Sequence, residues 1–180
     1  MRFVRIPRDR IGVLIGHKGE VKEEIERLTK TRLKIDSRSG DVQIDDSRVD
    51  DPLAPIKAEN IVTAIGRGFS PEHAFRLLDD DAYFILFDLR DYVGRKENHI
   101  RRVKGRIIGR EGRTKRILEN MTDSIISVYG HTVAVITTIE YLEVIRTAIE
   151  MLINGSKHGT VYKYLQRKRR EIEMGYHGNW

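Results

Sequence analysis

The sequence of 180 residues contains no cysteine, only four prolines and 7% aromatic residues. Without cysteine the chain cannot form a disulfide or a thiolate metal site, which suits a reducing compartment, and we expect a cytoplasmic protein. No apolar run reaches the length of about 18 residues that a membrane-spanning helix needs. The hydrophobic content of 39% is enough for one ordinary domain or two small ones.

The residue groups that build catalytic and metal centres are missing as well. The six histidines are scattered, and neither a His-Glu-x-x-His motif nor a pair of carboxylates accompanies them. The run Asp79–Asp81 is interpreted as a solvated cap before a strand. We therefore expect a protein that is not an enzyme, with no catalytic residues, no cofactor and no metal.

Positive charge is concentrated in the second half of the chain. The overall net charge of +6 divides into −1 for residues 1–90 and +7 for residues 91–180. The densest cluster, from Arg95 to Arg116, contains only two acids, Glu97 and Glu111. Its ten basic residues are Arg95, Lys96, Arg101, Arg102, Lys104, Arg106, Arg110, Arg113, Lys115 and Arg116. Such a cluster attracts polyanions, although a solvated basic face has the same composition.

The chain also repeats itself. Residues 12–19 match residues 105–112 at an offset of 93, and the match continues without a gap until Ile35 lies over Val128. Each copy contains a Gly-x-x-Gly segment, Gly16–Gly19 and Gly109–Gly112. A long internal match of this kind indicates two structural units of similar fold.

Hydrophobic periodicity gives both units the order strand, helix, helix, strand, strand, helix. In the second copy we expect strands at 83–87, 124–129 and 132–136, and helices at 98–108, 112–120 and 141–152. In the first copy we expect strands at 3–6, 32–36 and 41–45, and a last helix at 56–65 after an exposed acidic loop. The predicted domains are residues 1–78, residues 79–155, and a basic C-terminal helix and tail at 156–180.

A Gly-x-x-Gly segment between two helices suits a nucleic-acid backbone. Glycine lacks Cβ, so the chain can turn sharply and a phosphate chain can come close to it. The free N–H groups and the positive dipole end of the following helix then face the phosphates. Neither segment ends in Gly-Lys-Ser/Thr, and both follow a helix rather than a strand, so neither fits a nucleotide-binding P-loop or a dinucleotide fingerprint.

In these features the sequence resembles the KH family of single-stranded nucleic-acid binders, whose loop clamps four backbone nucleotides. It departs from the usual pattern in one place, because Lys22 and Lys115 stand where KH domains commonly have an aliphatic residue. The strings Gly109–Glu119 and Ala64–Ala74 instead resemble the archaeal relatives of the partner-of-Nob (Dim) proteins of ribosome assembly. The Krr-like assembly factors share both strings and are the near alternative.

The resemblance implies an α/β fold of tandem type I KH domains. Each domain would have a three-stranded antiparallel sheet with three helices, and a C-terminal helix would follow the second. It also implies binding of single-stranded RNA near the 3′ end of small-subunit ribosomal RNA, and contact with the Nob endonuclease. Two alternatives stay open: a KH nucleic-acid binder outside ribosome assembly, and an RNA-processing enzyme that docks substrate through its KH units.

The candidate RNA-binding residues lie around the second loop. They are Lys104, Gly105, Arg106, Ile108, Gly109, Arg110, Glu111, Gly112, Arg113, Thr114, Lys115 and, on the following strand, Ile126. Ile108 and Ile126 are equally compatible with a place in the core. Secondary candidates for RNA or a protein partner are Gly16, His17, Lys18, Gly19, Lys22, Arg167, Lys168, Arg169 and Arg170. The sequence leaves open whether the first unit binds RNA or protein.

Overall fold

The chain folds into two compact units, residues 1–80 and the residues from 81 onward. The structure, a computed structural model, describes residues 1–178, with side chains up to residue 175. The last two residues of the expected tail therefore lie outside the described residues. Within residues 1–178 no helix is long and apolar enough to cross a membrane.

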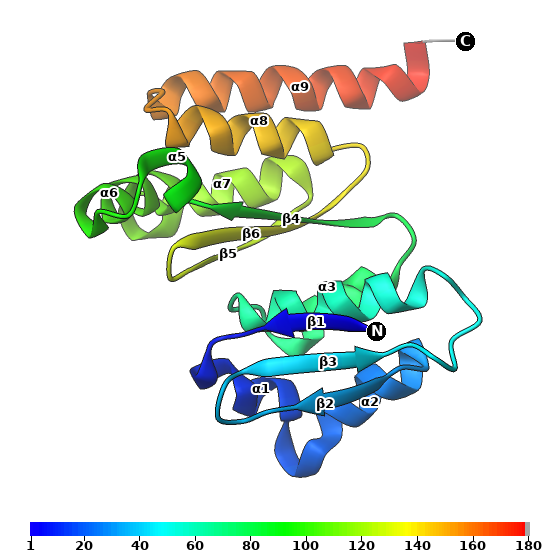
Figure 1. Cartoon of the computed structure of the whole chain (residues 1–180). Helices are drawn as coiled ribbons and strands as arrows, with labels where there is room; N and C mark the ends of the chain where they lie inside the picture. Colours follow the sequence, from blue (N-terminus) through cyan, green and yellow to red (C-terminus); the bar gives the residue numbers. More distant parts are fainter. Residues whose placement is uncertain (179–180) are drawn as a thin grey trace. The chain divides into compact units, whose positions relative to one another are not determined.

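The first unit is one antiparallel sheet with its helices packed against it (Figure 1). Its sheet has the order β1-β3-β2, so β3 is central and β2 is an edge strand. The elements are β1 (Arg2–Arg5), α1 (Ile11–Ile15), α2 (Glu20–Thr29), β2 (Arg32–Ile35), β3 (Asp41–Asp45), α3 (Ala54–Gly66) and α4 (Pro71–Ala74). Short 3-10 turns occupy Arg8–Arg10, His17–Gly19 and Phe75–Leu78.

The second unit repeats this arrangement and extends it at its C-terminal end. Its sheet has the order β4-β6-β5, with β5 at the edge. The elements are β4 (Ala82–Asp88), α5 (Arg90–Val93), α6 (Glu97–Ile108), a 3-10 turn at Arg110–Gly112, α7 (Arg113–Thr122), β5 (Ile125–Tyr129), β6 (Thr132–Thr138), α8 (Leu142–Ile153) and α9 (His158–Gly178). The tandem type I KH fold expected from the sequence is thus confirmed.

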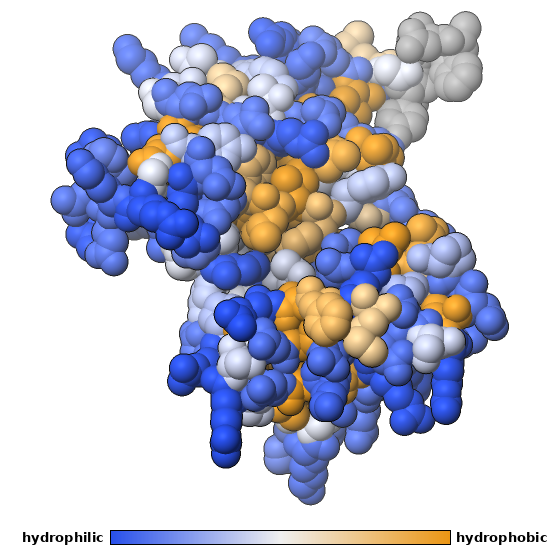
Figure 2. All heavy atoms as spheres, viewed as in Figure 1, coloured by the Kyte–Doolittle hydropathy of each residue, from blue (hydrophilic) through white to orange (hydrophobic). Residues whose placement is uncertain are grey.

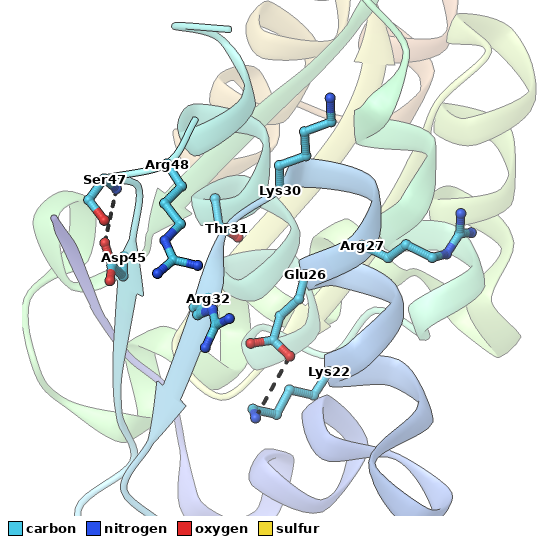
Figure 3. A pocket seen from close by; sticks show the side chains of 9 residues that line it. All are labelled: Lys22, Glu26, Arg27, Lys30, Thr31, Arg32, Asp45, Ser47 and Arg48. Atoms are coloured by element: carbon cyan, nitrogen blue, oxygen red, sulfur yellow. Dashed lines mark hydrogen bonds and ion pairs between the residues drawn. The ribbon is translucent and has the colours of Figure 1, made fainter. Parts of the chain in front are cut away.

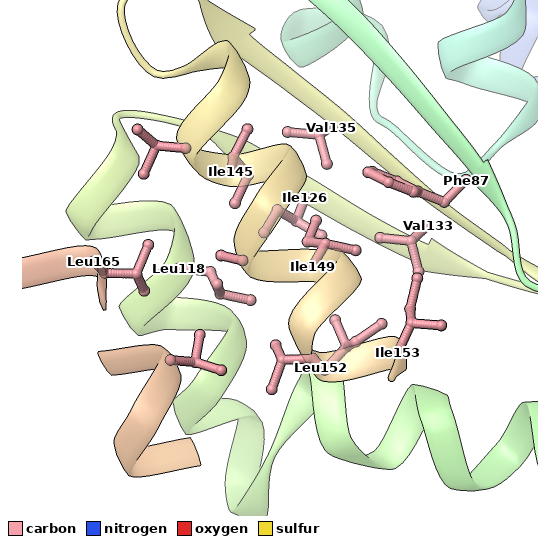
Figure 4. Packing of buried hydrophobic residues seen from close by; sticks show 14 of the residues in the cluster. Phe87, Leu118, Ile126, Val133, Val135, Ile145, Ile149, Leu152, Ile153 and Leu165 are labelled. Atoms are coloured by element: carbon pink, nitrogen blue, oxygen red, sulfur yellow. The ribbon is translucent and has the colours of Figure 1, made fainter. Parts of the chain in front are cut away.

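Alternation of apolar residues fixes which face of each sheet the helices cover. In the first unit Leu33, Val42 and Ile44 point into the core and are nearly or fully buried. In the second unit Ile126 and Val135 do the same and belong to one apolar cluster with α8 (Figure 4). The helices supply the other half of each core. In each unit the edge strand contacts the second helix, β2 with α2 and β5 with α7.

The predicted element order is correct, and the differences lie at the ends and in short elements. Helix α7 ends at Thr122 rather than at residue 120, and the last helix of the first unit begins at Ala54 rather than at residue 56. Two single-turn helices, α4 and α5, were not predicted. Each spans only four residues, too few for a periodic pattern to show in the sequence.

Helix α9 is part of the second unit and is not a loosely attached tail. Val161 and Leu165 are fully buried in the same cluster as α8, as their spacing predicts. Four exposed cations were expected at Arg167–Arg170, but Arg169 differs. Its guanidinium donates hydrogen bonds of 3.1 Å to the carbonyls of Asn120 and Met121 at the end of α7. The expected boundary at residue 156 therefore crosses a continuous core.

Removing the buried contact of α9 should destabilise the whole second unit. We expect Leu165→Ala to lower the free energy of unfolding by about 2–5 kcal/mol, because a fully buried leucine loses its burial and leaves a cavity. The neighbouring Gln166 is exposed, and Gln166→Ala is the matched control with an expected change of less than about 0.5 kcal/mol. Denaturant unfolding followed by circular dichroism measures both, and equal stability of the two variants would mean that α9 is not part of the core.

Candidate nucleic-acid interface

The second Gly-x-x-Gly loop forms a tight link between α6 and α7. Gly109 ends α6 at φ 76° and ψ 174°, and Gly112 precedes α7 in the left-handed region at φ 75° and ψ 13°. Glu111 between them is also left-handed, at φ 54°. The guanidinium of Arg116 donates a 2.7 Å hydrogen bond to the Glu111 carbonyl and so braces this unusual backbone. Three of the four loop residues therefore have a positive φ, and this backbone reverses the chain within one short loop.

The first loop has nearly the same backbone. Gly16 lies at φ 76° and ψ 176°, Lys18 at φ 53° and Gly19 at φ 79°. Its surroundings differ, because α2 carries Glu20 and Glu23 in its first turn, whereas the first turn of α7 contains no acid. A phosphate at the start of α7 would meet the positive end of the helix dipole and cations, and one at the start of α2 would also meet carboxylates.

The two glycines of each loop are required for different reasons. A Cβ on Gly109 would lie 2.3 Å from Thr114 Oγ1 and 2.7 Å from the Thr114 nitrogen, so the start of α7 would have to move. On Gly112 the nearest atom would be the flexible Arg116 guanidinium at 3.2 Å, and only the left-handed backbone disfavours a side chain. The first glycine therefore sets the packing of the two helices, and the second sets the turn.

A lysine and a glutamate on α7 occupy the edge of β5. Glu119 accepts a 2.9 Å hydrogen bond from the backbone N–H of Ile126, and Lys115 Nζ lies 3.4 Å from the same carboxylate. The arrangement repeats in the first unit, where Glu26 accepts from the Leu33 N–H at 2.9 Å and Lys22 is its ion-pair partner at 3.8 Å. The lysine that replaces the usual aliphatic residue thus belongs to a polar device that covers the edge amide.

A basic cleft of 530 Å³ opens beside α6 and the turn between β5 and β6. Arg90, Arg95, Arg101 and Lys104 supply its cationic lining, and His131 lines it as well. Figure 2 shows hydrophilic residues gathered over the α5 and α6 end of this unit. The sequence had indicated Lys104 as a candidate and Arg95 and Arg101 as members of the basic cluster. Arg90 and His131 were missed, because the turn that brings His131 next to α6 is not visible in a linear charge count.

Asp88 fixes two of the groups that line this cleft. It accepts hydrogen bonds from the Arg90 guanidinium, the shortest 2.8 Å, and its Oδ1 lies 3.2 Å from His131 Nδ1. These bonds, with the charges of Arg90 and His131, hold the pKa of Asp88 well below its usual range. The carboxylate therefore stays ionised and keeps both groups at the rim of the cleft.

The structure divides the predicted RNA-binding residues into exposed and internal groups. Lys104, Gly105, Ile108 and Arg113 are exposed or half-buried, as are the loop residues 109–112, and they follow one another along α6, the loop and the start of α7. Arg106, in contrast, donates 2.9 Å hydrogen bonds to the carbonyls of Leu152 and Ile153 at the end of α8. The charge that Arg106 was expected to offer to RNA is used inside the fold.

Two further candidates, Thr114 and Ile126, are internal as well. Thr114 is 2% exposed, and its hydroxyl lies 2.8 Å from the Tyr162 hydroxyl of α9. Ile126 is 4% exposed and belongs to the core cluster, whereas the half-buried Ile108 does not. Of the two isoleucines, only Ile108 retains a surface that a base could contact.

The secondary candidates lie in separate places. His17 and Lys18 are exposed in the first loop between Gly16 and Gly19, and Lys22 is half-buried on α2. On α9, Arg167 and Arg170 are exposed, while Lys168 is half-buried and pairs with Glu171 at 3.2 Å. Among the described residues, no three histidine or acidic side chains are placed to hold a metal ion.

Two helices joined by a Gly-x-x-Gly loop beside the edge of a three-stranded antiparallel sheet, present twice, define a tandem KH protein of type I. Residues 83–170 match the family described as eukaryotic type KH-domain (KH-domain type I), and residues 1–70 match the KH domain family. The KH domain-containing protein MJ0443 of Methanocaldococcus jannaschii is 42% identical over the whole of this chain and 79% of its own length.

Solved structures agree with this class. Dim2p from Pyrococcus horikoshii OT3 is 52% identical with a TM-score of 0.84, covering 92% of this chain and 98% of its own. The same organism's a/eIF2alpha-aDim2p-rRNA complex contains a chain that is 51% identical with a TM-score of 0.86, over 94% of each. The chain belongs to the Dim2/PNO1 family of KH proteins. The pre-rRNA-processing protein PNO1 of Saccharomyces cerevisiae is 26% identical over 82% of this chain, which spans 54% of that longer protein.

Alanine at three glycines should have effects of different sign. Gly109→Ala should lower the free energy of unfolding by about 1–3 kcal/mol, because its Cβ meets the backbone of α7. Gly112→Ala should cost about 1–2 kcal/mol through its left-handed backbone alone. Gly105 lies inside α6 with open space around its Cβ position, so Gly105→Ala should stabilise by about 0.5–1 kcal/mol. Denaturant unfolding gives the order, and a stabilised Gly109→Ala variant would contradict it.

Glu119 should stabilise the second unit through the oxygen that accepts the Ile126 hydrogen bond rather than through its negative charge. Glu119→Gln keeps a carbonyl oxygen for the Ile126 amide and should change the free energy of unfolding by less than about 0.5 kcal/mol. Glu119→Ala leaves that amide without its partner and should cost about 1–2 kcal/mol. Hydrogen exchange of the Ile126 amide should accelerate in the alanine variant only. Equal acceleration in both variants would indicate that the ion pair with Lys115 holds the edge closed.

Proposed function

We propose that this protein binds single-stranded RNA of the small ribosomal subunit near its 3′ end and serves in ribosome assembly and rRNA processing. It acts by holding the RNA and carries out no chemical step. The relatives named above include a pre-rRNA-processing protein and a chain of a complex with rRNA. We expect the protein to carry out this role in the cytoplasm.

The observation that carries the proposal is the chemistry around the second loop. The positive dipole end of α7 adjoins Arg110 and Arg113, which form no ion pair within the described part of the chain. The cleft beside α6 adds Arg101 and Lys104. A phosphate chain entering between Gly109 and Gly112 meets the cations Arg110 and Arg113, with Glu111 as the one carboxylate of the loop, while Ile108 offers an apolar surface to a base.

Two protein partners fit this role. The resemblance to partner-of-Nob proteins points to a Nob-type endonuclease that trims the 3′ end. The solved complex of the Pyrococcus relative contains an a/eIF2alpha chain, which makes a translation factor the second candidate. The exposed Arg167 and Arg170 on α9 are available to either partner.

The test compares equivalent loop variants in the full chain. Arg110 and Glu111 are both changed to Asp in one variant, and His17 and Lys18 in the other. Aspartate tolerates the left-handed backbone at Glu111 and Lys18, so both variants should fold. We expect the second-unit variant to lose most of its affinity for a single-stranded RNA from the 3′ end of small-subunit rRNA, and the first-unit variant to lose much less.

The salt dependence supplies a second readout. If four or five phosphates are held at the second loop, the logarithm of affinity should fall with the logarithm of salt concentration with a slope of about −3, at about −0.7 per phosphate. The second-unit variant should flatten this slope. Equal losses in the two variants would show that both loops contribute alike. Cleavage of the RNA by the purified protein with Mg²⁺ would favour an enzyme instead.

A further inference from the structure

A basic pocket of the first unit lies away from its Gly-x-x-Gly loop. It measures 720 Å³ and is lined by the last turns of α2, the start of β2 and the segment that follows β3 (Figure 3). Its size falls within the range of about 300–1,000 Å³ that is usual for small-molecule sites. Lys22 and Glu26 of α2 lie on one side, and Arg32 of β2 and Arg48 lie on the other (Figure 3).

The two arginines are the unusual feature of this pocket. Figure 3 shows the side chains of Arg32 and Arg48 beside one another, with the Arg32 guanidinium directed toward the Glu26 side of the pocket. Neither forms an ion pair with a carboxylate anywhere in residues 1–178. Asp45 lies nearby, and its pKa is lowered mainly by hydrogen bonds from Ser47 and less by Arg48. Two neighbouring arginines that form no ion pair with Glu26 or Asp45, the carboxylates of the lining, leave room for an additional anion.

Two of the other basic residues at the pocket already have ion-pair partners, and the side chain of Lys30 points away from the two arginines (Figure 3). Lys22 pairs with Glu26 at 3.8 Å, and Arg27 points away and pairs with Glu24 at 2.6 Å. At 3.6 residues per turn, Lys22 and Glu26 share a stripe that faces the pocket, while Glu20, Glu23 and Glu24 fall on another face of α2. The acids of α2 that oppose a phosphate at the loop therefore do not line this pocket.

In the second unit, the position that corresponds to this pocket is covered by α9. At the offset of 93, Lys30 and Arg32 correspond to Asp123 and Ile125, so the cations are absent there. In their place Arg169 of α9 reaches the end of α7, with an ion pair of 3.5 Å to Asp123 and hydrogen bonds to two carbonyls. The first unit has no corresponding helix within its residues 1–80 and supplies its own cations instead.

We propose that Arg32 and Arg48 form a second RNA site that binds phosphates of a single strand beyond the first loop. Guanidinium groups suit this ligand because each can donate two hydrogen bonds to one phosphate. Lys22 lies on α2 only three residues after Gly19. An RNA strand that leaves the first loop and follows α2 therefore reaches the pocket before the helix ends. The Lys22–Glu26 pair at the wall then presents a donor and an acceptor to a base edge.

This inference rests on the proposed RNA binding but assigns a role to the unit whose loop is the weaker phosphate site. It also differs from a docking site for an acidic protein, which would use the same two cations. An extended phosphate chain needs repeated contacts at regular spacing. The loop and the pocket, joined by α2, provide two such contacts.

The test removes the two cations and keeps the fold. Arg32→Gln/Arg48→Gln is compared with Arg8→Gln/Arg76→Gln, which removes the same charge from exposed positions of the same unit outside the pocket. Both full-length variants are titrated with single-stranded rRNA of about twelve nucleotides, three times the span of one KH loop. We expect the pocket variant to bind about tenfold more weakly and its salt slope to flatten by about 1.4, at about 0.7 per lost phosphate.

The control variant should retain the slope of the unaltered protein. In NMR spectra of the unaltered protein, the amides of Ser47 and Arg48 should shift on addition of RNA. If the unaltered protein binds RNA and the pocket variant matches the control, the pocket is not an RNA site, while the proposed function stands. If polyglutamate shifts these amides and RNA does not, the pocket binds an acidic protein. Absence of RNA binding by the unaltered protein would refute the proposed function itself.

Discussion

The close approach of α7 to the end of α6 is the contact on which both candidate RNA surfaces of the second unit depend. It exists because Gly109 has no Cβ where Thr114 sits against the loop. Thr114 in turn contacts Tyr162, and His158 Nε2 lies 2.9 Å from the Arg106 carbonyl at the end of α6. The absence of a Cβ at Gly109 thus allows α7 to start against the end of α6, and the contacts of Thr114 and Arg106 attach α9 to both helices.

The same backbone serves two chemical environments. Residues 16–33 and 109–126 agree in loop angles and in the carboxylate that covers the edge amide, and even in a buried hydroxyl pair, Thr29 with Thr31 and Thr122 with Ser124, each at 2.7 Å. The two units differ in the charges at their loops and in whether a further helix covers the end of the second helix. The second unit has free cations at its loop and a helix over the end of α7, and the first has carboxylates at its loop and an open cationic pocket.

Sequence alone predicted most of this fold, because the offset of 93 and the alternation in the strands report on packing that is local to each unit. It could not predict which groups distant in the sequence a basic side chain would bind. Arg106 was assigned to RNA on charge and position, yet its partners are carbonyls 46 and 47 residues away. Carbonyl groups carry no signal in a sequence, so the capping roles of Arg106 and Arg169 were invisible. Glu119, in contrast, repeats Glu26 at the offset of 93, and that match was a usable signal.

A protein that holds RNA without acting on it gains from spreading its contacts over several weak sites. Each phosphate contact is sequence-tolerant and salt-dependent, so a single loop gives affinity with little selectivity. Two sites on one chain raise the effective concentration of RNA at the second once the first is occupied.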